Sequence, residues 1–214
     1  MSDDYIEDAE DTEEQELAER ASAVIDQLDR IAEMVWAECL RFCKPDCCVL
    51  ATRVFCNVAR EFGYEADGIS VLAVAEADML RVVLGGRPKE KNGFVWCGHL
   101  AASVKAGGEL FLVDTSIAQM ESMSDRIKVR PIVMKVDEAV ISGRALIVAE
   151  LPCGAKLSWR RWDGNHDGQW REAPDWQPSK LNQAITAASI AKLQGREYDY
   201  PKSLTMLAAM GVWM

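Results

Sequence analysis

The chain has 214 residues, of which 49% are hydrophobic and 27% charged, as in an ordinary globular protein that is large enough to bury a core without disulfides or metals. Its formal net charge of −10 is concentrated at one end, because ten of the 34 acidic residues lie in residues 1–20. Residues 21–214 hold 24 acidic and 23 basic residues. No basic patch or stripe appears along the chain, so the composition argues against a nucleic-acid partner.

The acid-rich N-terminus predicts a disordered tail over residues 1–15, because its charges repel one another and it has little apolar surface to bury. A basic partner and a contribution to solubility are both consistent with such a tail. The segment is also unlike an export or transit signal, and no apolar run approaches the length of a membrane span. Seven cysteines, an odd number, then favour reduced thiols and a cytoplasmic location without membrane attachment.

Two helices are expected next. Apolar residues recur at three- and four-residue steps over residues 16–42, which predicts a helix that Lys44-Pro45-Asp46 brings to an end. A second helix follows, with Asp46 as its N-cap, Cys48 on its apolar face and Gly63 as its C-cap.

The remainder is expected to form antiparallel strands followed by a helix. The predicted strands are 68–75, His99–Val104, Leu110–Asp114, 131–136, 144–151 and 156–162. The predicted loops are Gly85–Pro88, within a mixed segment, and residues 163–178. A helix is predicted over residues 179–194, with Ser179 at its start and Gly195 directly after it. The apolar residues 204–214 are expected to pack back on the body. This order predicts an α+β fold with residues 16–214 as a single domain that carries a C-terminal hairpin and helix extension.

Cys48 is the candidate nucleophile. A residue in the first turn of a helix meets unpaired backbone N–H groups and the positive end of the helix dipole, and both favour a thiolate. Its own N–H can face a developing oxyanion. Cys47 is the alternative, but its side chain points about 100° away around the helix.

His99 and Asp114 are the candidate partners of Cys48. If residues 105–108 or Ala106-Gly107 form the turn of the first hairpin, His99 lies directly opposite Asp114; if Gly107-Gly108 form it, the two are diagonal neighbours. Either turn keeps both side chains on one face. Because Asp114 closes an apolar run, its carboxylate is costly unless paired, and we expect it to hold Nδ1–H of His99 while Nε2 faces Cys48.

Two runs resemble a known superfamily. The run Cys48–Gly63 resembles the nucleophile helix of transglutaminase-like, papain-related proteins, and Gly98–Val104 with Phe111–Ser116 resembles their histidine and aspartate hairpin, in a form similar to a bacterial branch. The resemblance covers roughly residues 44–120. It implies a papain-like or transglutaminase-like core with the nucleophile helix packed on an antiparallel sheet, and a peptide or amide substrate without a cofactor. Cys48 is then the nucleophile, His99 the general base and acid, and Asp114 the orienting group.

Two departures from the family concern the substrate. Many members carry Arg where this chain has Asp67, and an aromatic residue where it has Ala101. Trp36 is either an oxyanion-hole residue or a core side chain.

Other interpretations stay open. The same scaffold without activity would be a binding or assembly protein that uses its acidic tail and its tryptophans as contact surfaces. A thiol-bound metal is also conceivable, although Cys39, Cys43 and Cys47 lack the Cys-x2-Cys spacing of zinc sites, and the loop around His166 lacks the full calcium pattern. Four tryptophans of the C-terminal half are candidates for a groove or for packing: Trp159, Trp162, Trp170 and Trp176.

Overall fold

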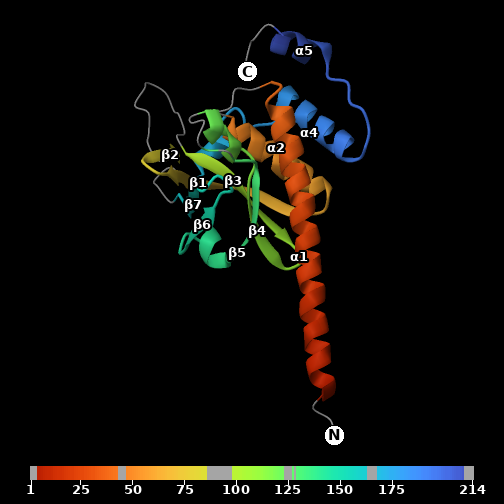
Figure 1. The fold of residues 1–214 in the computed structure, drawn as a ribbon. Helices are drawn as coiled ribbons and strands as arrows, with labels where there is room; N and C mark the ends of the chain where they lie inside the picture. The colour runs from red at the N-terminus through yellow and green to blue at the C-terminus, as the bar shows by residue number, and fades with distance from the viewer. Residues whose placement is uncertain are drawn as a thin grey trace.

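The computed structural model describes residues 4–42, 47–85, 98–122, 127, 129–162 and 168–209 (Figure 1). The helices in these ranges are α1 (Asp4–Cys39), α2 (Cys48–Glu61), α3 (Glu138–Ile141), α4 (Lys180–Leu193) and α5 (Lys202–Ala209), with the 3-10 helices η1 (Ile117–Ser122) and η2 (Gln169–Glu172). The strands are β1 (Glu65–Ala77), β2 (Leu80–Leu84), β3 (His99–Ala106), β4 (Glu109–Asp114), β5 (Ile132–Val136), β6 (Leu146–Glu150) and β7 (Lys156–Arg161). The mixture of helices with an antiparallel sheet confirms the predicted α+β class.

Helix α1 begins at Asp4, well before the start at residue 16 that the apolar pattern predicted. The segment expected as a disordered tail over residues 1–15 is therefore helical from Asp4 onward, and Figure 1 shows this end of α1 extending beyond the rest of the molecule. Residues 4–15 include four glutamates, which lose little side-chain freedom in a helix. Within the ranges given above, no helix combines the length and apolar character needed to cross a membrane.

The seven strands form one curled antiparallel sheet in the order β5-β4-β3-β1-β7-β6, with β2 paired to β1 off this path. All the strands that the sequence predicted are present. Strand β2 was missed because it is short and its connection to β1 lacks glycine: Asp78 takes the left-handed conformation instead, with φ of 51°. The turn between β3 and β4 is Gly107-Gly108, and both glycines have positive φ.

The two faces of the sheet bury separate cores. Helices α1 and α2 cover one face, and α4 packs against both helices; Phe55 of α2 and Phe111 of β4 belong to the core on this side (Figure 1). The opposite, concave face encloses Trp159 of β7 together with Ile117 and Met120 of η1. Because side chains alternate along a strand, each residue of β3 or β4 faces either the helices or the concave side.

The C-terminal elements follow the predicted signals. Ser179 caps α4 by accepting a hydrogen bond from the Asn182 backbone at 3.1 Å, and Gly195 follows the helix with a φ of 72°. Leu204 of α5 is buried, in agreement with an apolar end that packs back on the body, whereas residues 210–214 lie outside the described part.

A buried carboxylate fastens α1 to these elements. Glu38 is 2% exposed and accepts hydrogen bonds from Lys192 Nζ of α4 and from the Tyr200 hydroxyl, both at 2.6 Å, while Arg41 Nε lies 3.2 Å away. Burial, reinforced by the bond to Glu38, raises the pKa of Tyr200, so its hydroxyl keeps its proton and donates.

Removal of this carboxylate should destabilise the protein strongly. Glu38→Ala leaves Lys192 and Tyr200 without their acceptor, and we expect it to lower the free energy of unfolding by about 2–4 kcal/mol in urea titration. Glu33→Ala on the same helix is the matched control, because Glu33 is exposed and pairs with exposed Arg130 at 3.7 Å; its loss should stay below about 0.5 kcal/mol. Equal losses in the two variants would contradict the role of Glu38.

Candidate functional site

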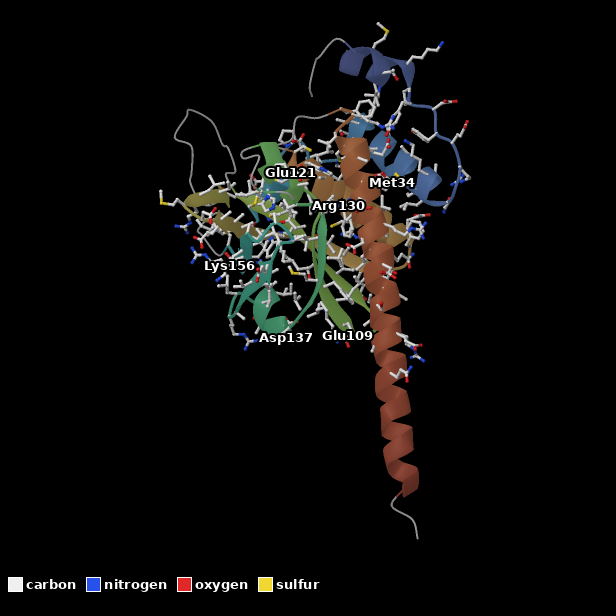
Figure 2. The ribbon with its side chains drawn as sticks, in the orientation of Figure 1. Met34, Glu109, Glu121, Arg130, Asp137 and Lys156 are labelled. Atoms are coloured by element: carbon white, nitrogen blue, oxygen red, sulfur yellow. The ribbon has the colours of Figure 1, made fainter. Side chains whose placement is uncertain are left out.

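The candidate site forms where the strand paired with one edge of β1 changes from β3 to β2. Strand β1 pairs with β3 as far as Val71, which lies opposite His99, and from Ala73 onward it pairs with β2 through Leu84. His99 is therefore the first residue of β3, at the junction between two strands that share one edge of β1. The site lies toward the end of the sheet marked by Glu121 in Figure 2, away from Glu109 and Asp137.

Gly85 closes this junction by direct contact. Its φ is 88°, and a Cβ atom added to it would lie 2.9 Å from the backbone nitrogen of His99 and 3.0 Å from the carbonyl oxygen of Val71. The absence of a side chain at Gly85 thus allows β2 to end against the backbone that positions His99.

His99 and Asp114 form a buried pair on the concave side of the sheet. The hairpin register pairs Ala102 with Val113, so the two residues are diagonal neighbours on one face, as predicted for a Gly107-Gly108 turn, and the directly opposed register is wrong. His99 Nε2 lies 2.9 Å from Oδ1 and 2.8 Å from Oδ2 of Asp114. The ring is 1% exposed and the carboxylate 0%.

The ring orientation corrects one expectation. Asp114 was expected to hold Nδ1 of His99, but it holds Nε2. The diagonal register explains this, because the carboxylate approaches the far side of the ring instead of the atom nearest the strand. Nδ1 is therefore the nitrogen left to exchange a proton with a reactant.

Asp114 has a second donor that the sequence did not reveal. Trp159 of β7 donates from Nε1 to Asp114 Oδ2 at 2.9 Å, and the indole is 1% exposed. A buried carboxylate needs such donors to offset its lost hydration. Trp159 is thus a core residue with a polar role, and neither of the two expectations for the tryptophans, a groove or simple packing, describes it fully.

Burial by itself lowers the pKa of His99, but its partners outweigh that effect. The Asp114 carboxylate, by charge and by hydrogen bond, and then Cys48, by hydrogen bond and charge, raise the pKa of the ring to about 10. The imidazolium form is therefore the dominant form of His99 near neutral pH.

Cys48 reaches this pair from the helix side. It is the first residue of α2, which confirms its placement in the first helical turn. The predicted N-cap is wrong, because Cys47 takes that position instead of Asp46, which lies outside the described residues. Thr52, one turn later, donates from Oγ1 to the carbonyl oxygen of Leu100 at 2.9 Å and so fixes the helix next to His99. Cys48 is partly exposed, whereas Cys47 is 8% exposed and belongs to the core.

Gln119 is a further polar neighbour that sequence reasoning missed. Its Nε2 lies 3.3 Å from Nδ1 of His99, and it comes from η1, directly after β4. A neutral ring that carries its proton on Nε2 can accept this bond at Nδ1, whereas a protonated ring donates from Nδ1 and needs an acceptor there. No pattern in the sequence signals this contact, because η1 itself is not encoded by a strong periodicity.

The remaining candidates lie elsewhere. Trp36 is partly buried against the helix-side core, and Trp170 and Trp176 pack on each other at a centroid distance of 4.3 Å on that same side. Cys43 and His166 lie outside the described residues. In the part of the chain that the structure describes, no three His, Cys, Asp or Glu residues gather as metal ligands would.

Comparison with known proteins adds no relative. The sequence matches no protein-family model, a search of curated proteins returns no match, and no solved structure matches the fold. The transglutaminase-like resemblance therefore stays a prediction.

The contact at Gly85 can be tested by adding one methyl group. Gly85→Ala combines an unfavourable φ with a clash against His99, and we expect it to cost about 1–3 kcal/mol more free energy of unfolding than Gly154→Ala. Gly154 is the matched control because its φ is 80° and a Cβ atom there meets nothing within 4 Å. Urea titration measures both variants, and similar losses would show that Gly85 does not constrain His99.

The His99–Asp114 pair also sets a pH dependence. The folded pKa of about 10 exceeds the ordinary value of 6.5, so the pair stabilises the fold fully below pH 6.5 and loses that contribution as the pH rises through 10. Urea titrations from pH 6 to 10 should show this decline in the wild type and a weaker one in Asp114→Asn. A wild-type decline that Asp114→Asn leaves unchanged would assign the dependence to other groups.

Proposed function

We propose that the chain is a cysteine-dependent acyl-transfer enzyme with Cys48 as nucleophile, His99 as general acid and base, and Asp114 as the group that orients the ring. The observation that carries the proposal is the contact of one imidazole with a buried carboxylate on one side and a thiol at a helix start on the other. A transglutaminase-like core with the α2 helix packed on the sheet is part of the same proposal.

In the proposed mechanism, His99 faces the Cys48 thiol and assists formation of the attacking thiolate. The thiolate attacks the carbonyl carbon of an amide or ester, and the negative charge moves to the carbonyl oxygen. That oxygen is expected next to the backbone N–H groups of the first turn of α2, which no intrahelical carbonyl satisfies.

Collapse of this intermediate breaks the bond to the leaving group, and Nδ1 of His99 gives its proton to the departing amine or alkoxide. A thioester on Cys48 remains. Water or an amine then attacks the thioester, His99 takes a proton from the attacking group, and the thiolate leaves. The products are those of hydrolysis with water and of transamidation with an amine.

Alkylation by iodoacetamide at pH 6 tests the nucleophile directly. We expect Cys48 to react more than about tenfold faster than the exposed Cys153, because Cys48 lies at a helix start in contact with His99, which can take its proton. Peptide mass spectrometry measures both sites in one sample. Cys56 serves as an internal blank, since burial raises the pKa of its thiol to about 12.

His99→Ala should remove the excess reactivity of Cys48, and Asp114→Asn should reduce it. Slow and equal labelling of Cys48 and Cys153 in the wild type would favour the alternative, a binding or assembly protein that retains the scaffold without the activity.

A further inference from the structure

Arg53, which lies on the same helix as Cys48, has no acidic partner among the described residues. Arg53 stacks over the ring of Trp176, with its guanidinium carbon 4.9 Å from the ring centroid, and its Nε is buried without a hydrogen-bond partner among the described residues. The neighbouring arginines differ, because Arg60 and Arg171 both approach the carboxylate of Asp67, at 4.0 and 3.0 Å. The positive charge of Arg53 is thus uncompensated within the described part of the chain.

Two contacts fix where Arg53 lies over the sheet. Arg60 donates to the carbonyl oxygen of Ala66, and Thr52 bonds to Leu100, which pairs with Ser70 of β1. Arg53 lies two helical turns before Arg60 on the same side of α2, a shift of about 10 Å, or roughly three residues along a strand. From this shift and the Thr52–Leu100 contact, we place Arg53 over the part of β1 that contains Ser70.

Ser70 is a second unsatisfied donor at this place. It is fully buried, and its Oγ has no hydrogen-bond partner among the described residues. A buried polar atom of this kind costs about 1–3 kcal/mol unless a ligand or water satisfies it. Side-chain donors that lie together without an acceptor, one of them cationic, fit a carboxylate as ligand.

Trp170 and Trp176 pack on β1 beside this region. A Cβ atom on Gly68 would lie 2.9 Å from Cη2 of Trp170 and 3.0 Å from Cη2 of Trp176, so both indoles rest directly on the strand two residues before Ser70. The stacked ring of Trp176 holds the guanidinium of Arg53 in one orientation.

We propose that Arg53 and Ser70 bind a carboxylate of the substrate, so that the acyl-transfer site prefers acidic peptides or amides. The inference rests on the proposed function, because it concerns the substrate of that reaction. Binding of the carboxylate can still be tested without any reaction. Arg53 lies five residues after Cys48, about 8 Å along the helix and about 140° around it, a separation that corresponds to roughly three residues of an extended peptide. The carboxylate is therefore expected about three residues from the reacting carbonyl, either as a chain terminus or as an acidic side chain.

Binding is tested without any reaction in the Cys48→Ala variant. N-acetyl-glycylglycine and its neutral amide are titrated at constant ionic strength while NMR follows the Nε–H resonance of Arg53, which Arg53→Gln identifies by its absence. We expect a saturable shift with the acid and none with the amide. The absence of a saturable shift with the acid, or the same shift with both compounds, overturns the carboxylate site whatever the reactivity of Cys48.

Alkylation then tests whether the site serves Cys48. N-bromoacetyl-glycylglycine should label Cys48 at least about threefold faster than its amide in the wild type, and Arg53→Gln should abolish this preference. Arg171→Gln is the matched control: Arg171 also stacks on a tryptophan, Trp170, but Asp67 already neutralises it, so the preference should persist.

Two results distinguish the role of Arg53 in carboxylate binding from the role of Cys48 as nucleophile. A preference that survives Arg53→Gln overturns the role of Arg53 while leaving the nucleophile intact. A Cys48 that fails to react with iodoacetamide overturns the proposed function, and the NMR titration still decides the carboxylate site. Replacement of the N-terminal glycine of the probe by aspartate, with the terminus amidated, distinguishes an acidic side chain from a chain terminus.

Discussion

The buried contact between His99 and Asp114 is the interaction on which the rest of the site depends. A carboxylate with no exposed surface is stable only when donors surround it, and here the ring of His99 and the indole of Trp159 supply them. The same contact keeps His99 in one orientation and favours its protonated form. It therefore leaves Nδ1 as the ring atom that can serve a thiol.

The fold brings three separate segments to this contact. The hairpin of β3 and β4 supplies His99 and Asp114 from adjacent strands, and β7, more than forty residues later, supplies Trp159. The α2 helix supplies Cys48 from the other side of the sheet, at the junction where the strand paired with β1 changes from β3 to β2. Because β3 begins at His99, a residue at the start of α2 can reach the ring past the end of the strand.

Much of this arrangement could be predicted from the sequence, because local signals are strong here. Gly107-Gly108 determines the hairpin turn, and the two-residue period of strands then places His99 and Asp114 on one face. Cys48 was placed in the first turn of its helix because Asp46 was expected as the N-cap, and the placement is right although Cys47 is the N-cap.

Other features could not be predicted because they arise only from tertiary contacts. Trp159 and Gln119 approach the pair from segments whose position depends on how the sheet curls, and no periodicity encodes that curl. The choice between Nδ1 and Nε2 depended on whether Asp114 lies diagonally or directly opposite His99. The pattern of apolar residues is the same in both registers and cannot distinguish them. The extension of α1 to Asp4 reflects helix propensity in a segment whose charge pattern argued for disorder.

The most direct test of the account is the detection of an acyl group on Cys48. The wild-type protein is mixed with p-nitrophenyl acetate, the release of p-nitrophenolate is followed in a stopped-flow instrument, and the quenched protein is analysed by peptide mass spectrometry. The account predicts a burst of about one equivalent, an acetyl group on Cys48, and loss of both in Cys48→Ala. An acetyl group spread over lysines and exposed thiols, without a burst, would contradict it.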